Sequence, residues 1–173
     1  MSKATAGTQP PTKVKAATRR RVGRAWREIR RGAAASRIKD LFYGMGPDGI
    51  EMALADALSI LVQNGPMRMG ELAEALHITP ATATRAVDCL VDRGLAERVK
   101  AVDDLRSILV SATEAGEARH TVIAARIGTG LDQILGQFNA EEQVQLADLL
   151  ERFVDAVDHY VANEDNSDDA PAS

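Results

Sequence analysis

The stretch GELAEALHITPATATRAVDCLVDRGLAERVKAVDDLRSILVSAT, residues 70–113, decides the fold. Its spacing predicts a short helix over 70–76, a tight turn, and a second helix that begins at Pro80. Thr79 is a favourable N-cap because its hydroxyl can accept a hydrogen bond from a free amide, and Pro80 has no amide hydrogen to satisfy. Gly94 can adopt the left-handed conformation that ends a helix. The stretch therefore predicts a helix-turn-helix.

The second helix has one apolar and one polar face. The apolar positions recur three and four residues apart: Ala83, Ala86, Val87, Leu90 and Val91. The opposite face carries Ala81, Thr84, Arg85, Asp88 and Asp92, with Thr82 and Cys89 on its flank. Small residues let the backbone approach the major groove of DNA, hydroxyls bond phosphates or base edges, and arginine can bond guanine. An ordinary solvated helix face has the same composition, so the helix by itself leaves both interpretations open.

Two strand patterns follow the second helix. They cover residues 95–100 and 108–110 and flank a charged turn at 103–107. A hairpin of this kind beside a helix-turn-helix is a wing. The expected fold class is therefore mainly α with a small β-wing, a winged helix-turn-helix DNA-binding head.

The segment resembles the winged helix of MarR-type transcriptional regulators. The wing pattern of that family is Asp-x-Arg-x-x-x-Val-x-Leu-Thr followed by a glycine, and the matching residues are Asp104, Arg106, Val110, Thr113 and Gly116. Ala112 stands where leucine is usual, and Gly70 stands where a serine or threonine cap is common. Further matches precede the wing, at Gly65, Pro66, Met67, Arg68, Glu71, Leu72, Ala73, Thr84, Arg85, Asp88, Leu90 and Gly94. The resemblance covers residues 54–116.

The resemblance implies a sequence-specific DNA-binding regulator, and it indicates a role for each exposed polar residue. The residues expected to read or approach the major groove are Thr79, Ala81, Thr82, Thr84 and Arg85. Arg106, at the wing tip, is expected in the minor groove, with Asp104 holding its orientation. The candidate phosphate contacts are Arg68, Arg98, Lys100 and Ser107.

Helical patterns flank the head on both sides. A loosely continuous pattern runs through Val22, Trp26, Ile29, Ala33, Ile38, Leu41 and Phe42. A longer stripe near the C-terminus consists of Leu146, Leu149, Leu150, Phe153, Val154, Val157, Tyr160 and Val161. These stripes predict N- and C-terminal dimerisation helices. A two-fold homodimer presents two recognition helices to a short inverted repeat in double-stranded DNA.

The expected domain organisation follows from these patterns. It comprises a disordered basic arm, an N-terminal helical dimerisation region, the winged head, C-terminal dimerisation helices and a disordered acidic tail, over residues 1–17, 18–49, 50–113, 114–162 and 163–173. Thr113 is expected to cap the helix that follows the wing, and Asn139 with Glu142 resembles a capping box before the last helix.

Charge is distributed unevenly along the chain. The formal net charge is −4, yet residues 1–39 hold twelve Lys or Arg and the single acid Glu28. Such a basic segment is typical of sequence-independent phosphate binding, with Arg19, Arg20 and Arg21 as the candidate arm contacts. A solvated helix face with a flexible tail explains the same composition, so this point stays open.

Other chemistry finds little support in the sequence. There is no glycine-rich phosphate loop, and the spacing of His77, His120 and His159 does not suit a metal site. We therefore expect no enzyme activity, no metal and no cofactor. Cys89 is interpreted either as a redox-sensitive thiol or as a small packing residue. With one cysteine, no apolar run long enough to span a membrane and no signal-peptide core, a cytoplasmic protein is expected.

The resemblance also implies a small aromatic or phenolic ligand in a cleft between the dimerisation helices and the head. The candidate lining residues are Trp26, Phe42, Tyr43, Met45 and Met52, although apolar residues at helical spacing also suit a core. Two function classes remain: a dimeric repressor that releases its operator on ligand binding, and an architectural or protein-interaction protein whose basic arm coats DNA with little sequence preference.

Overall fold

The computed structural model describes residues 13–44, 49–100 and 108–168. The elements in chain order are α1 Ala16–Arg31, α2 Ala33–Tyr43, α3 Met52–Asn64, β1 Met67–Arg68, α4 Met69–Ala75, α5 Pro80–Asp92, β2 Ala96–Lys100, β3 Ile108–Ala112, α6 Glu114–Leu135 and α7 Ala140–Asp168. The chain divides into two compact units, one up to Arg126 and one from Ile127 onward. The expected fold class is confirmed: a mainly helical protein with one small antiparallel sheet.

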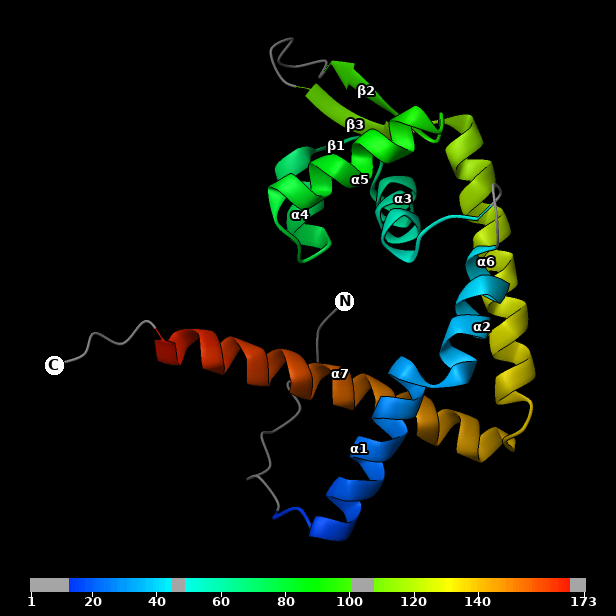
Figure 1. Cartoon of the computed structure of the whole chain (residues 1–173), viewed down its shortest axis with the longest axis vertical. Helices are drawn as coiled ribbons and strands as arrows, with labels where there is room; N and C mark the ends of the chain where they lie inside the picture. Colours follow the sequence, from blue (N-terminus) through cyan, green and yellow to red (C-terminus); the bar gives the residue numbers. More distant parts are fainter. Residues whose placement is uncertain (1–12, 45–48, 101–107, 169–173) are drawn as a thin grey trace, which may run out of the picture. The chain divides into compact units, whose positions relative to one another are not determined.

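The sheet has the strand order β1-β3-β2, and α3, α4 and α5 gather on one side of it (Figure 1). The predicted hairpin of β2 and β3 is present, with Ala96 opposite Ala112 and Lys100 opposite Ile108. Strand β1 was not predicted. It is two residues long, too short for any periodicity, and it exists because it pairs with β3 in the folded chain.

The core of the head includes four of the five apolar residues that the sequence pattern predicted for the second helix of the helix-turn-helix. Side chains that are less than one tenth exposed come from the residue before α3, from α3, α4 and α5, from both hairpin strands and from α6: Ile50, Leu54, Ala55, Ala57, Leu58, Leu61, Leu72, Ala73, Ala83, Ala86, Val87, Leu90, Ala96, Val110 and Ile123. Of the apolar face predicted for α5, Val91 alone stays half-buried. Helical periodicity therefore identified the buried side of the recognition helix correctly.

Hydrogen bonds of Thr113 connect the end of the wing to the start of α6. The Thr113 hydroxyl donates to the Gly94 carbonyl at 2.7 Å and accepts from the Gly116 amide at 3.1 Å, which confirms Thr113 as the cap of α6. Gly94 has the expected left-handed backbone, with φ of 69°. A Cβ atom at Gly116 would lie 2.1 Å from the Leu95 carbonyl oxygen, so no larger residue fits this close approach.

The N-terminal helical region differs from the expected single, loosely continuous helix. Gly32 is extended, with φ of −66° and ψ of 161°, and it separates α1 from α2. Its close approach to the preceding turn explains why glycine stands there, since a Cβ atom would lie 2.4 Å from the Glu28 carbonyl oxygen. Helix α1 also begins at Ala16, two residues inside the expected arm.

Three other helix limits differ from expectation. The Arg68 amide donates to the Glu71 carboxylate at 2.7 Å, so α4 begins at Met69 and Gly70 lies inside it rather than at its cap. Helix α3 begins at Met52, two residues after the expected start of the head at residue 50. The last helix continues to Asp168, beyond the limit expected at residue 162, because no glycine or proline interrupts it before Pro171.

The second unit contains the end of α6 and the whole of α7. The predicted capping box is present: the Glu142 amide donates to Asn139 Oδ1 at 3.0 Å, and the Asn139 amide donates to Glu142 Oε2 at 2.9 Å. Gln143 Nε2 donates to the carbonyls of Leu135 and Phe138, each at 3.0 Å, which fixes the turn between the two helices. In the described part of the chain, no helix is long and apolar enough to cross a membrane.

Candidate nucleic-acid interface

The interface begins at the N-terminus of α5. Thr79 caps this helix as predicted, since its hydroxyl accepts from the Thr82 amide at 3.3 Å and Pro80 occupies the first turn. The hydroxyls of Thr79 and Thr82 also bond each other at 2.9 Å. The helix therefore starts at one defined residue, and its free amides and positive dipole end point outward from there.

The polar face of α5 is exposed along its first two turns. Ala81, Thr82, Thr84 and Arg85 are all exposed, whereas Ala83 and Val87 on the opposite face have no exposed surface. The Thr84 hydroxyl donates to the Pro80 carbonyl at 2.9 Å and keeps its lone pairs for an incoming donor. Within the described residues, Arg85 makes no hydrogen bond or ion pair. Its guanidinium is therefore available for a ligand.

Arg98, a candidate phosphate contact, is paired with a carboxylate. Its Nη2 donates to Asp88 Oδ1, which joins the middle of β2 to the polar face of α5. The two side chains are 37% and 53% exposed, so the pair lies at the surface of the head. A phosphate contact by Arg98 would have to compete with this carboxylate.

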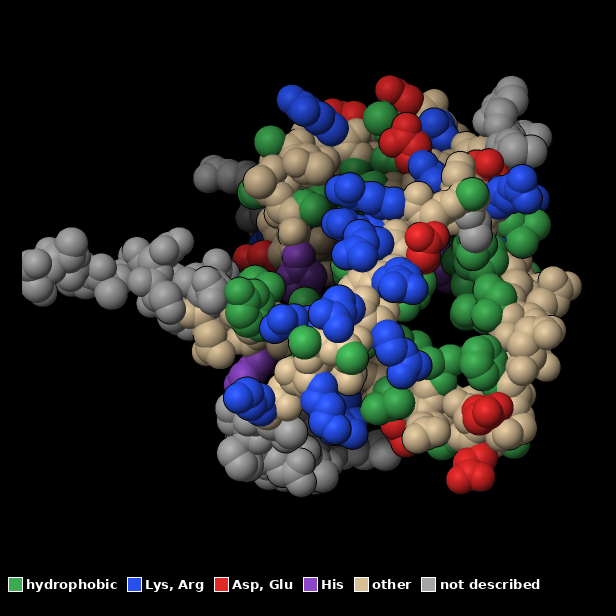
Figure 2. Space-filling model, turned by 60° about the horizontal axis from the view of Figure 1, so that its bottom comes forward, with side chains coloured by type: hydrophobic (Ala, Val, Ile, Leu, Met, Phe, Trp, Pro, Cys, Tyr) green, Lys and Arg blue, Asp and Glu red, His purple; other side chains and the backbone are tan. Residues whose placement is uncertain are grey.

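The remaining DNA-contact candidates lie in different places. Arg68, in β1, and Lys100, at the end of β2, are both exposed. Asp104, Arg106 and Ser107 lie outside the described residues. All seven arginines of α1 are exposed: Arg19, Arg20, Arg21, Arg24, Arg27, Arg30 and Arg31. Figure 2 shows Lys and Arg side chains gathered across one face of the molecule.

One residue that anchors the recognition helix was not among those that the sequence indicated. Arg93, at the C-terminal end of α5, donates from Nη1 to the Gly49 carbonyl at 3.0 Å. Gly49 precedes α3, and the neighbouring Ile50 amide donates to the Tyr43 carbonyl at the end of α2. The bonded residues are 44 positions apart in the sequence, so no local spacing could have indicated the contact.

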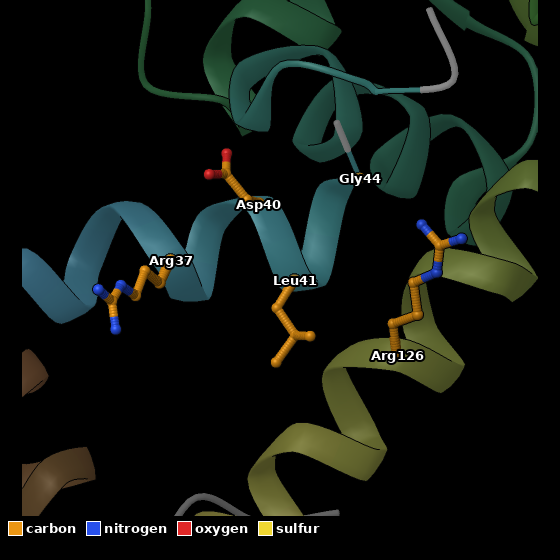
Figure 3. A pocket seen from close by; sticks show the side chains of 5 residues that line it. All are labelled: Arg37, Asp40, Leu41, Gly44 and Arg126. Carbon is orange, nitrogen blue, oxygen red and sulfur yellow. The ribbon is translucent and has the colours of Figure 1, made fainter. Parts of the chain in front are cut away.

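A hollow of about 430 Å³ lies between α2 and α6 (Figure 3). Its lining consists of Arg37, Asp40, Leu41 and Gly44 from α2 and its C-terminal end, and Arg126 from α6. Within the described residues, neither guanidinium makes an ion pair. The hollow therefore combines two guanidinium groups and the Asp40 carboxylate with the apolar surface of Leu41.

The ligand-pocket residues expected from the sequence do not line this hollow. Met52 borders another, of about 580 Å³, formed mainly by α1 and α2, while Trp26, Phe42 and Tyr43 border neither of the two. Met45 lies outside the described residues. Periodicity marks apolar positions, but it does not report which of them border empty space, and this explains the difference.

Two titratable groups at the end of α2 and in α3 have raised pKa values. Partial burial raises the pKa of the Tyr43 hydroxyl, and the nearby negative charge of Asp56 raises it further. Partial burial also raises the pKa of the Asp56 carboxyl.

Among the residues that the structure describes, the remaining candidates show no built site. Cys89 is exposed on α5. No group of three His, Cys, Asp or Glu side chains in the described ranges is arranged to hold a metal ion.

Comparison with known proteins gives a consistent result. The MarR family model matches residues 50–108, from the start of the head into β3. The Homoprotocatechuate degradative operon repressor of Escherichia coli is 32% identical over 95 residues, which are 55% of this chain and 64% of that protein. The aligned part of the chain thus spans less than two thirds of this curated relative's length.

Solved structures extend the likeness beyond the head. A probable transcriptional regulator from Pseudomonas aeruginosa is 30% identical with a TM-score of 0.60, and the match covers 76% of this chain and 96% of that one. Streptococcus pneumoniae FabT, solved in complex with DNA, has a TM-score of 0.71 at 15% identity and covers 82% of this chain and 99% of its own. At that identity, the second likeness shows the fold alone.

Proposed function

This chain belongs to the MarR family of transcriptional regulators, and we propose that it is a homodimeric repressor in the cytoplasm that binds an inverted-repeat operator. The observation that carries the proposal is the exposed first half of α5, where three small residues and the unpaired Arg85 surround a capped helix N-terminus. This surface suits the major groove, because small side chains permit close approach and a free guanidinium can bond both acceptors of guanine.

The two-fold dimer is proposed from the terminal helices. The apolar stripe of α7 is largely exposed, with fractions between 41% and 65% at Leu149, Leu150, Phe153, Val154, Val157, Tyr160 and Val161. A stripe of this length is typical of a surface that another copy of the chain covers. Two heads related by such an axis would meet half-sites about one helical turn of DNA apart.

We further propose that the hollow between α2 and α6 receives a small aromatic acid. Arg37 and Arg126 supply more positive charge than the single Asp40 carboxylate offsets, which suits a ligand carboxylate, and Leu41 supplies an apolar surface for a ring. The name of the E. coli relative, a repressor of a homoprotocatechuate degradative operon, agrees with this chemical class. Ligand binding there would lower the affinity for the operator, which is how a repressor of this kind responds to a metabolite.

The architectural alternative draws on α1, which carries seven arginines and the single acid Glu28. In that case, phosphate attraction would dominate and sequence preference would be weak. We propose no catalytic activity in either case, and the residues of the interface are polar contacts rather than a nucleophile with its base.

Selection of bound sequences from a random duplex pool, at near-physiological salt, separates these two functions. The full chain is compared with a variant that lacks residues 1–17, with Arg85→Ala, and with Arg152→Ala as a control on the exposed surface of α7. We expect the full chain, the truncated variant and Arg152→Ala to enrich the same inverted repeat. Arg85→Ala should bind this repeat more weakly by roughly 1–3 kcal/mol and should relax one position in each half-site. Absence of any enriched motif, with affinity lost as salt rises or the arm is removed, would favour the architectural function.

A further inference from the structure

The ion pair of Asp88 and Arg98 connects the two parts of the head that would contact DNA. Asp88 lies on the polar face of α5, three residues after Arg85, and Arg98 is the central residue of β2. Arg98 Nη2 donates to Asp88 Oδ1 across the turn that joins this helix to the strand. The contact therefore bridges the recognition helix and the wing directly.

The rest of the junction lies on the same face of β2, nearer its start, where the strand is buried. Ala96, at the start of β2, is 3% exposed, and the Leu95 amide donates to the Leu90 carbonyl at 2.8 Å. Arg98 stands opposite Val110 of β3, which is 1% exposed and belongs to the core. The base of the wing is thus held by packing, and the ion pair adds a link to α5 two residues farther along the same face of β2, where the strand reaches the surface.

The Asp88–Arg98 pair also changes the charge of the polar face of α5. A lone carboxylate on the DNA-facing side of α5 would repel phosphates, and Arg98 compensates that charge. A guanidinium already bonded to a carboxylate has less to gain from a phosphate, because binding would first require the pair to open. Lys100, two residues along on the same face of β2, has no such partner among the described residues.

We propose that Arg98 is a positioning residue rather than a phosphate contact, and that its pair with Asp88 sets the angle between the wing and the recognition helix so that both engage DNA together. This inference rests on the proposed DNA-binding function. An exposed pair of this kind contributes little to global stability, so its effect should show in DNA binding and in the local mobility of β2.

The test compares Arg98→Gln, Asp88→Asn and the double variant in the full chain, with Lys100→Gln as the matched control on the same strand face. Affinity for the selected operator is measured over a range of salt concentrations. Each single variant should bind about three- to tenfold more weakly, and the double variant no more weakly than either, since all three remove one link. Their salt slopes should equal that of the unmodified chain, whereas Lys100→Gln should lower the slope by about 0.9.

The opposite pattern would overturn the proposal. If Arg98→Gln lowers the salt slope by about 0.9 and Asp88→Asn tightens binding, Arg98 is a phosphate contact that Asp88 restrains. Amide hydrogen exchange of residues 96–100 tests the positioning role without DNA. It should accelerate in Arg98→Gln and Asp88→Asn and stay unchanged in Lys100→Gln. Unchanged exchange in all three would refute the link itself, while failure of the unmodified chain to select an operator would refute the proposed function instead.

Discussion

The winged head and the terminal helices have the same kind of apolar periodicity but opposite degrees of burial. In α3, five apolar side chains are buried: Leu54, Ala55, Ala57, Leu58 and Leu61. In α1 no residue is buried, and Val22, Trp26 and Ile29 are at least half exposed. The apolar stripe of α7 is exposed in the same way. The head completes a core of its own, whereas the terminal stripes leave much of their apolar surface exposed.

The largest expected effect comes from breaking the core of the head. Leu58 has no exposed surface, so Leu58→Ala should lower the free energy of unfolding by about 2–5 kcal/mol through the cavity it leaves. Met52→Ala, on the same helix but 51% exposed, is the control and should change stability by about 0.5 kcal/mol or less. Urea denaturation measures both, and equal losses would show that the head lacks the tight core described above.

The next largest effect is expected on dimer association, when charged residues replace apolar residues of the α7 stripe. The double substitution Leu150→Asp and Phe153→Asp places charges on side chains that are 54% and 41% exposed in the single chain. If a second copy covers them, the dimer should weaken by at least about 2 kcal/mol, and operator affinity should fall with it while the head stays folded.

Asp155→Asn, on the opposite face of α7, is the matched control and should leave the dimer intact. Analytical ultracentrifugation measures the association, and circular dichroism checks the fold. A monomeric unmodified chain, or a double variant that dimerises as well as the control, would contradict the assignment of this stripe to the dimer.

A smaller effect is expected where the two regions meet through Arg93. Arg93→Gln removes the bond to the Gly49 carbonyl and should destabilise the head by about 0.5–1.5 kcal/mol. Because Gly49 lies in the segment that connects α2 to α3, the variant should also weaken any effect of the proposed small aromatic acid on operator affinity. Arg93→Lys keeps a donor and should retain part of both properties. Full retention of both in Arg93→Gln would exclude this contact as a link.

The smallest effect concerns Asp56, whose raised pKa makes its ionisation slightly unfavourable to folding. Stability from this group is fully present below the pKa of the unfolded chain and is lost as pH rises through the raised pKa of the folded one. Asp56→Asn should remove that loss, with a gain of about 0.5 kcal/mol or less at pH 7 because the side chain is exposed.

The same substitution should bring the pKa of Tyr43 closer to its usual value, since it removes the negative charge beside the hydroxyl. Ultraviolet titration of the tyrosines, with Tyr43→Phe to assign the signal, measures the shift. An unchanged tyrosine titration would mean that Asp56 does not act on this hydroxyl.

Much of the head was predictable because its determinants are local. Helical spacing identified the buried face of α5, Thr79 and Thr113 signalled their caps, and Gly94 signalled the end of the recognition helix. The break at Gly32 escaped prediction, because glycine is tolerated inside helices and the pattern on either side continued at helical spacing.

By itself, therefore, the sequence determined the helix-turn-helix, the hairpin, the caps and the polar face of α5, because each depends on residues within a few positions of one another. Tertiary structure alone decided that β1 pairs with β3, that Asp88 holds Arg98 and that Arg93 bonds to Gly49. It also placed Arg37 and Arg126 around one hollow. These contacts join residues from different elements, and only the closed core of the head and the packing of α2 beside it bring their side chains within bonding distance.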